Sequence, residues 1–184
     1  MADFVVDTNV LITATEAAQG GVAPRKMAAR GEVVEIQDPA TQRKVYEWVK
    51  AFRADSEALL VLDMPVSNIH KEYGNKLCDY EYGRIVAAEK LQNWQIRPAV
   101  GIEFVDNGNE RVARLPAHLE AVIGDVSDRK MVAAALATGA PIINASDTDW
   151  YDWEDVLKEA GVDVIHLVPE YSKAKWKAKK AERR

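Results

Sequence analysis

Acidic side chains follow two short apolar runs of this 184-residue chain. Asp7 comes directly after the run FVV, and Asp147 comes two positions after the run PIINA. Apolar runs of this length are typical of buried strands in a parallel sheet. Ligands of open parallel sheets bind in the crevice outside the carboxyl ends of the strands. We therefore expect Asp7 and Asp147 to face each other at that edge.

A third acid, Asp128, stands at the start of an expected helix, 19 positions before Asp147. One helix, one turn and one strand fit this spacing and return the chain to the same edge of the sheet. Carboxylate oxygens are hard ligands that suit Mg²⁺ or Mn²⁺, whereas clustered carboxylates without a cation repel each other. The pattern therefore predicts a site for one or two of these ions.

An alternation of apolar strands and amphipathic helices must position these acids. Further strands are expected at ALLVLD and VDVIHLV, and a β-hairpin at 102–114 around the turn residues DNGN. Helices are expected at 39–52, 65–77, around 85–91, at 128–138 and at 153–160, whereas 17–36 has the composition of a loop. This order predicts a three-layer α/β/α sandwich with a mostly parallel sheet, to which 17–60 adds a helical insertion.

Capping residues support two of the helix starts. Asp38 and Pro39 provide an N-cap and a first-turn proline, and Ser127 can cap the helix that begins at Asp128. Gly139 follows the end of that second helix and favours its termination.

Composition points to one soluble domain. The chain is 48% hydrophobic and 29% charged, which is ordinary for a globular protein. Its single cysteine, Cys78, excludes an intramolecular disulfide and fits a reducing compartment. The amino terminus has no basic region ahead of its apolar run, and no run of about 18 apolar residues follows. We expect a cytoplasmic protein that does not enter a membrane.

Charge is distributed unevenly along the chain. Residues 173–184 hold five Lys and two Arg against one Glu, a balance of +6, and the remaining residues carry −11. We therefore divide the chain into a domain at 1–172 and a basic tail at 173–184. The tail is either solvated or a nucleic-acid contact, in which case the phosphate-binding residues are its lysines, Lys173, Lys175, Lys177, Lys179 and Lys180.

Four sequence motifs together resemble those of the PIN-domain family, and they are spread over most of the chain. VVDTNVLI is similar to the first motif and selects Asp7, and PVSNIHKEYGNKL is similar to the second and selects Glu72. DRKMVAAALATGA is similar to the third and selects Asp128. IINASDTDW is similar to the fourth and selects Asp147, with Asp149 as an auxiliary acid.

The resemblance implies a metal-dependent endoribonuclease in which Asp7, Glu72, Asp128 and Asp147 bind Mg²⁺ or Mn²⁺ and catalyse hydrolysis of RNA. Two such ions about 3.5 to 4 Å apart can activate a water and stabilise the leaving oxygen. Members of the family include toxins of bacterial toxin–antitoxin pairs, so an antitoxin protein and a homodimer are also implied.

The chain departs from the family pattern in three places. Trp150 replaces the usual phenylalanine, Ala145 stands where threonine is common, and 64 residues separate Asp7 from Glu72. Because of this long separation, the resemblance does not indicate which surface of the chain binds a substrate or a partner.

Several polar neighbours of the four acids could assist them. Thr8, Asn9 and Ser146 could hydrogen-bond a ligand carboxylate or a scissile phosphate, and a capping or turn role is equally open to them. Asp125 could reach a metal ion through water, or be an ordinary loop acid. Trp150 is expected to pack rather than to stack on a base.

Other functions compete with this hypothesis. The same chemistry serves a structure-specific DNA nuclease, and a catalytically inactive PIN-like binding module is a further alternative. A haloacid-dehalogenase-like phosphatase needs a second acid where Asn9 stands, and a response-regulator receiver needs an acid pair and a later lysine that the sequence does not clearly provide.

Overall fold

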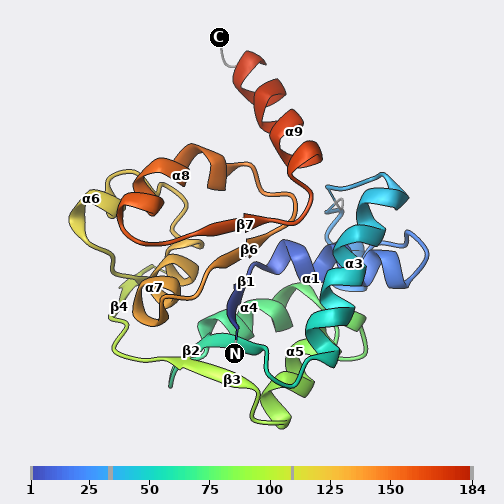
Figure 1. The fold of residues 1–184 in the computed structure, drawn as a ribbon, viewed down its shortest axis with the longest axis horizontal. Helices are drawn as coiled ribbons and strands as arrows, with labels where there is room; N and C mark the ends of the chain where they lie inside the picture. Colours follow the sequence, from blue (N-terminus) through green and yellow to red (C-terminus); the bar gives the residue numbers. More distant parts are fainter. Residues whose placement is uncertain (1, 33–34, 109, 183–184) are drawn as a thin grey trace.

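A five-stranded parallel sheet forms the centre of the protein, as seen in a computed structural model that describes residues 2–32, 35–108 and 110–182. The strand order is β3-β2-β1-β6-β7 (Figure 1). These strands are β1 (Asp3–Val6), β2 (Leu59–Asp63), β3 (Ile96–Ala99), β6 (Ile142–Asn144) and β7 (Val164–His166). Helices flank the sheet, so the predicted α/β/α sandwich is confirmed.

The central strands are apolar on both faces because both faces are covered. Val5, Val6, Ile142 and Ile143 are each 0% exposed. Strand β3, which the sequence analysis did not predict, lies at the edge of the sheet. Pro98 within it lacks a backbone donor, and an edge strand tolerates that lack.

Helices form a layer on each face of the sheet. Helix α7 (Arg129–Thr138) packs against β1, β2, β3 and β6, and α1 (Thr8–Ala18), α3 (Pro39–Ala54) and α5 (Tyr82–Gln92) pack against one another on the other face (Figure 1). The remaining helices are α2 (Arg25–Ala29), α4 (Asn68–Lys76), α6 (Ala117–Glu120), α8 (Asp149–Glu159) and α9 (Pro169–Glu182). None of the described helices is long and apolar enough to cross a membrane.

Several predicted boundaries are confirmed. The carboxylate of Asp38 accepts a hydrogen bond from the Thr41 N–H (2.8 Å), so it caps α3, which begins at Pro39. Gly139 ends α7 in the left-handed conformation, with φ of 72°. The predicted hairpin consists of β4 (Phe104–Asn107) and β5 (Glu110–Ala113), paired in antiparallel register.

Other boundaries were wrong. The expected loop at 17–36 contains the end of α1 and all of α2. The predicted helix at 65–77 begins later, at Asn68, because the Asp63 carboxylate accepts hydrogen bonds from Asn68 N–H and Ile69 N–H (both 2.8 Å). The N-cap of α7 is Asp128 instead of Ser127, and α8 begins at Asp149. The division at 172/173 falls inside α9, so residues 173–182 continue a helix that starts at Pro169.

Candidate active site

The strands β1 and β6 are hydrogen-bonded neighbours whose outgoing connections run in opposite directions. After β1 the chain proceeds to β2 on one side, and after β6 it proceeds to β7 on the other. Such a reversal opens a crevice at the carboxyl ends of the two strands, where open α/β sheets bind ligands. Asp7 follows β1 and Asp147 follows β6, so the sheet brings both predicted acids to this crevice.

Asp7 is buried and serves as the N-cap of α1. One carboxylate oxygen accepts a hydrogen bond from Asn9 N–H (3.2 Å), and the other accepts one from the indole N–H of Trp150 (2.7 Å). Burial and the neighbouring charges of Asp147 and Glu72 raise the pKa of Asp7 to about 7, although the two hydrogen bonds act against the rise. Asp7 therefore has a structural contact on each oxygen and lies within a group of acids.

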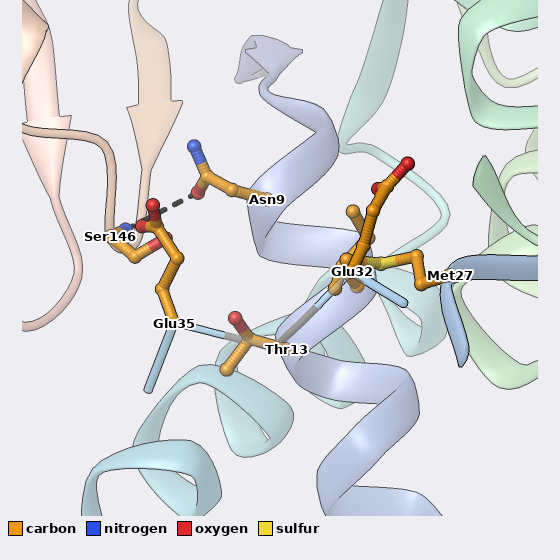
Figure 2. A pocket seen from close by; sticks show the side chains of 7 residues that line it. Asn9, Thr13, Met27, Glu32, Glu35 and Ser146 are labelled. Atoms are coloured by element: carbon orange, nitrogen blue, oxygen red, sulfur yellow. Dashed lines mark hydrogen bonds between the residues drawn. The ribbon is translucent and has the colours of Figure 1, made fainter. Parts of the chain in front are cut away.

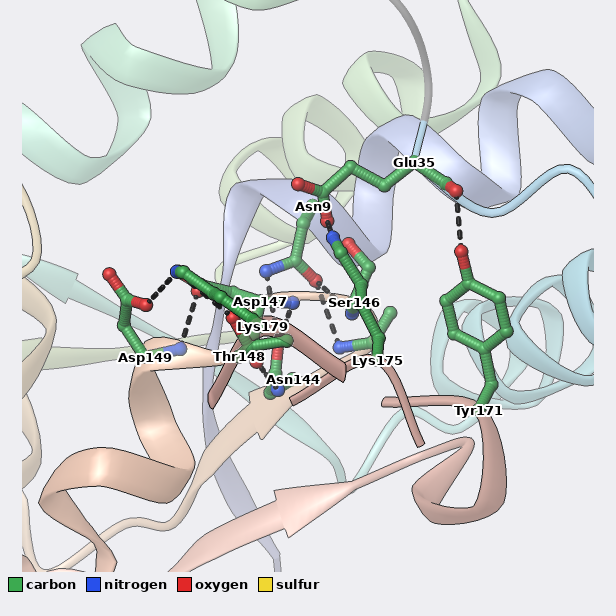
Figure 3. Close-up of polar contacts among 11 residues, drawn as sticks. Asn9, Glu35, Asn144, Ser146, Asp147, Thr148, Asp149, Tyr171, Lys175 and Lys179 are labelled. Atoms are coloured by element: carbon green, nitrogen blue, oxygen red, sulfur yellow. Dashed lines mark hydrogen bonds and ion pairs between the residues drawn. The ribbon is translucent and has the colours of Figure 1, made fainter. Parts of the chain in front are cut away.

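A network of amides holds the turn that carries Asp147. The Asn9 side-chain oxygen accepts hydrogen bonds from Ala145 N–H (2.9 Å) and Ser146 N–H (3.4 Å), and its amide nitrogen donates to the Asn144 side chain (3.0 Å) (Figure 3). Asn144 in turn accepts from Asp147 N–H (3.1 Å) and donates to the Asp147 carbonyl (2.8 Å). Asn9 thus fixes the start of α1 against the end of β6, which sets the position of Asp7 relative to Asp147.

Asp147 itself is half-buried, and its carboxylate accepts a hydrogen bond from Asp149 N–H (2.9 Å). The pKa of Asp147 lies above its ordinary value because burial, followed by the charge of Asp149, raises it more than that hydrogen bond and the charge of Lys179 lower it.

Asp128 lies at the N-cap of α7, where its side chain makes no capping hydrogen bond. Burial, followed by the charges of Asp7, Asp147, Asp125 and Glu72, raises its pKa to about 9. Asp128 therefore experiences the field of all three other predicted acids. Asp125 is exposed and accepts a hydrogen bond from Ser127 N–H (2.8 Å), which gives it a turn role and adds a further negative charge.

Glu72 reaches the group from α4. The neighbouring Tyr73 is fully buried and donates a hydrogen bond to the Val6 carbonyl (2.6 Å), so α4 is tied to the end of β1. One oxygen of Glu72 accepts a hydrogen bond from the Thr8 hydroxyl, and the other forms an ion pair with Lys130 (2.5 Å). The sequence analysis did not identify this lysine.

Two lysines of α9 line the same crevice as Asp7 and Asp147. Lys179 forms an ion pair with Asp149 (2.5 Å), and Lys175 forms one with Glu35 (2.7 Å) (Figure 3). The cleft at this position has a volume of about 490 Å³. It is lined by Asp7, Asn9, Glu35, Asp125, Asp147, Thr148, Asp149, Lys175 and Lys179. Lys173 and Lys177 are exposed, and Lys180 pairs with Asp152 (3.3 Å). Within the described part of the chain, these three lie outside the lining of the cleft.

A second recess of about 410 Å³ adjoins the cleft and shares Asn9 and Glu35 with it. Figure 2 shows Thr13 of α1, Met27 of α2, Glu32 and Ser146 in its other walls. Ile12 of α1 also lines the recess. The segment expected as an insertion therefore forms part of the wall beside the acids.

The donors fit a hard divalent cation, because they are carboxylates brought together from four elements. As the side chains stand, however, no three Asp, Glu, His or Cys side chains among the described residues are arranged to hold a metal ion. Glu72 and Asp149 are each paired with a lysine instead. Either carboxylate would have to leave its lysine before it could contact a metal ion.

Three residues of the site have roles that the sequence analysis missed. Trp150, expected only to pack, also donates a hydrogen bond to Asp7. Asn144 organises the turn at 144–147, and Lys130 neutralises Glu72. The one available signal was Trp150, because tryptophan in place of phenylalanine adds a hydrogen-bond donor next to an acid motif.

Comparisons with protein-family models, with curated proteins and with solved structures find no match to this chain.

Proposed function

We propose that the protein is a Mg²⁺- or Mn²⁺-dependent endoribonuclease of the PIN-domain type. The observation that carries the proposal is the convergence of Asp7, Asp128, Asp147 and Glu72 at the point where the strand connections reverse direction. One or two divalent ions bound there would activate water and stabilise the leaving oxygen of a phosphodiester.

The residues of the chain have distinct tasks in this proposal. Asp7, Asp128 and Asp147 supply hard oxygen ligands, and Glu72 joins them when Lys130 is displaced. Trp150 and Asn9 N–H hold the two oxygens of Asp7, so its carboxylate is oriented before a metal ion arrives. The Thr8 hydroxyl does the same for Glu72. Burial, followed by the charges of neighbouring acids, raises the pKa of Asp7, Asp128 and Asp147, and a bound cation would favour the ionised form of each.

A second candidate function is a catalytically inactive nucleic-acid-binding module. The observation in its favour is that Glu72 and Asp149 are already paired with Lys130 and Lys179. Against it, neither lysine pairs with Asp7 or Asp128. The pKa values of these two acids therefore stay raised, and a binding module without a metal ion would gain nothing from that arrangement.

The resemblance to toxin-type PIN proteins also leads us to propose a cytoplasmic location and either self-association or binding of an antitoxin protein. Neither property is needed for the chemistry at the acids.

A cleavage assay tests the proposed reaction. Purified protein is incubated with single-stranded RNA and with flapped DNA, each with Mg²⁺, with Mn²⁺ or with EDTA. Metal-dependent cleavage of RNA is the expected result. Cleavage of flapped DNA alone would reassign the protein as a structure-specific DNA nuclease, and tight binding of RNA without cleavage in any metal would favour the binding module.

A further inference from the structure

Glu72 also lines a basic groove, which shares no lining residue with the cleft that α9 borders. Its volume is about 510 Å³, and it is lined by Arg30, Asn68, Lys71, Glu72, Asn75, Lys76, Arg111, Val126, Ser127 and Lys130. Five of these ten residues are cationic and only Glu72 is acidic. We refer to this cavity as the basic groove.

One face of α4 forms the floor of the basic groove. Asn68, Lys71, Glu72 and Asn75 recur at helical spacing and point to the cavity, whereas Ile69 and Tyr73 of the same helix are fully buried in the core. The polar side of this amphipathic helix therefore presents cations and amides next to a predicted catalytic acid.

The two segments that the sequence analysis left without a function supply the walls. Arg30 follows α2 in the segment expected as a helical insertion, and Arg111 belongs to strand β5 of the hairpin. The hairpin packs against α7, whose first turn contributes Lys130. Each added segment thus brings one arginine to the same cavity.

The cations of the groove are only partly neutralised. Arg30 and Lys76 share Glu32 (3.0 and 2.9 Å), and Arg111 lies 3.6 Å from the highly exposed Asp106. Lys130 pairs with Glu72, and Lys71 has no ion-pair partner within the described ranges. Five positive charges face three negative ones, and pairs between exposed charges are weak enough for another anion to replace them.

The basic groove is continuous with the acid cluster. Glu72 belongs to both, and residues 125–127 separate the two cavities, with Asp125 in the wall of the cleft and Val126 and Ser127 in the wall of the groove. An extended polyanion that passes over Asp7 and Asp128 would therefore have cations on either side, Lys71 and Arg111 on one and Lys175 and Lys179 on the other.

We propose that the basic groove binds the sugar–phosphate backbone of single-stranded RNA on one side of the bond to be cleaved. This inference rests on the proposed nuclease function. The cations and amides contact phosphates without reading base edges, so binding along the groove is independent of sequence. The helical insertion and the hairpin are then substrate-binding elements.

Measurements of RNA binding by a variant that does not cleave RNA test the groove. The full chain carrying Asp128→Asn is titrated with a fluorescent single-stranded RNA at several salt concentrations in EDTA, with and without Lys71→Gln and Arg111→Gln. Each lost phosphate contact flattens the dependence of log affinity on log salt by about 0.7, so the double change should lower the slope by roughly 1.4. The matched control, Lys44→Gln with Lys50→Gln, removes two exposed lysines of α3 and should leave the slope unchanged.

The outcomes separate the groove from the nuclease function. If the parent cleaves RNA but the groove variant keeps its slope, or if the control lowers it equally, the groove proposal is overturned and the nuclease function stands. If the parent binds RNA without cleaving it and the groove variant alone loses slope, the groove stands and the nuclease function fails. If polyglutamate binds and RNA does not, the groove receives an acidic protein and the RNA proposal is overturned.

Discussion

Asp7 combines two roles at the scale of single residues. It caps α1 and it also belongs to the acid cluster, with one oxygen bonded to Asn9 N–H and the other to Trp150. Replacement by asparagine would leave one of these donors without an acceptor, so lost stability and lost metal binding would be mixed. Asp128 makes no capping hydrogen bond, and a change there isolates the chemical role.

Trp150 is the positioning residue whose removal gives the clearest signature. Its hydrogen bond lowers the pKa of Asp7, and a hydrogen bond to a charged group contributes about 1.5 to 3 kcal/mol. Trp150→Phe should therefore move the acidic limb of the pH–rate profile upward by roughly one pH unit or more. It should also weaken Mn²⁺ binding, because the metal requires ionised Asp7.

Trp153→Phe is the matched control for Trp150→Phe. Trp153 is also buried and packs edge-on against Trp150, with ring centroids 5.5 Å apart. It should lower stability through lost volume and leave the pH–rate profile in place. Equal shifts of the profile in both variants would show that packing, and not the indole hydrogen bond, sets the pKa of Asp7.

Local sequence selected four candidate acids but gave no sign of their hydrogen-bond partners. The motif around Asp7 predicts a strand-end acid, yet Asp63 also ends an apolar strand, and its carboxylate accepts hydrogen bonds from the first two N–H groups of α4. The two differ in what the fold brings near them: Trp150 reaches Asp7 from 143 positions away. Partners so far apart in the sequence, such as Asn9 and Asn144, meet only because β1 pairs with β6. The residues of either segment alone do not predict that pairing.

Contact between α1 and α5 positions the layer of helices on one face of the sheet. Gly83 donates a hydrogen bond from its N–H to the Thr15 hydroxyl (2.9 Å), and a Cβ at this position would lie 2.4 Å from the Leu11 carbonyl oxygen. Gly83→Ala should therefore force the helices apart and lower the free energy of unfolding by about 1 to 3 kcal/mol, as measured by urea denaturation.

Gly74→Ala is the control for Gly83→Ala. Gly74 lies within α4, and its nearest contact for an added Cβ is the flexible end of Arg84 at 3.5 Å. Because alanine favours a helix interior over glycine, this change should leave stability unchanged or raise it by up to about 1 kcal/mol. A Gly83→Ala variant as stable as the Gly74→Ala variant would contradict the close packing of α1 and α5.

Helix α9 presents its lysines unequally. Lys175 and Lys179 reach the cleft and pair with Glu35 and Asp149, whereas Lys173 and Lys177 are exposed. If RNA phosphates replace these acids, Lys175→Gln with Lys179→Gln should lower the salt slope of RNA binding by roughly 1.4, and Lys173→Gln with Lys177→Gln should lower it less. Equal losses from the two pairs would indicate a diffuse basic tail.

Element boundaries were predictable where local chemistry sets them. Asp38 with Pro39 and Gly139 marked helix ends that the structure retains. Strand β3 was missed because Arg97 and Pro98 interrupt its apolar pattern, and only pairing with β2 makes it a strand. Helix α9 was missed because its alternating lysines lack an apolar stripe; contacts such as Tyr151 with Ser172 (2.9 Å) hold it to the body.

The acid cluster makes the stability of the whole molecule depend on pH. The pKa of Asp7 is raised from 3.8 to about 7 and that of Asp128 from 3.8 to about 9, so the folded state holds protons that the unfolded state has released. Their contribution to stability is fully present below pH 3.8 and is lost as pH rises through these values.

In EDTA, the free energy of unfolding should therefore fall between pH 7 and pH 9, by at most about 1.4 kcal/mol per pH unit for each proton. This window lies above the titration of His70 and His166, whose pKa values burial lowers. Urea denaturation across the window measures the fall, and Asp128→Asn should reduce it. Stability that rises with pH in the parent would contradict the clustering of the acids.

Metal binding by the four acids is the central claim, and thermal unfolding of the parent and of Asp128→Asn at pH 7.5, with and without Mn²⁺, tests it most directly. Asp128 is largely protonated at this pH without metal, so the two metal-free proteins should be equally stable. At a concentration 100 times its Kd, Mn²⁺ should stabilise the parent by about 2.7 kcal/mol, or roughly 5 to 11 °C in Tm, and should have little effect on the variant. RNA cleavage in the same buffers should be lost together with that stabilisation. A variant that is less stable without metal yet retains the Mn²⁺ shift and the cleavage would contradict the account, because Asp128 would then be a structural residue.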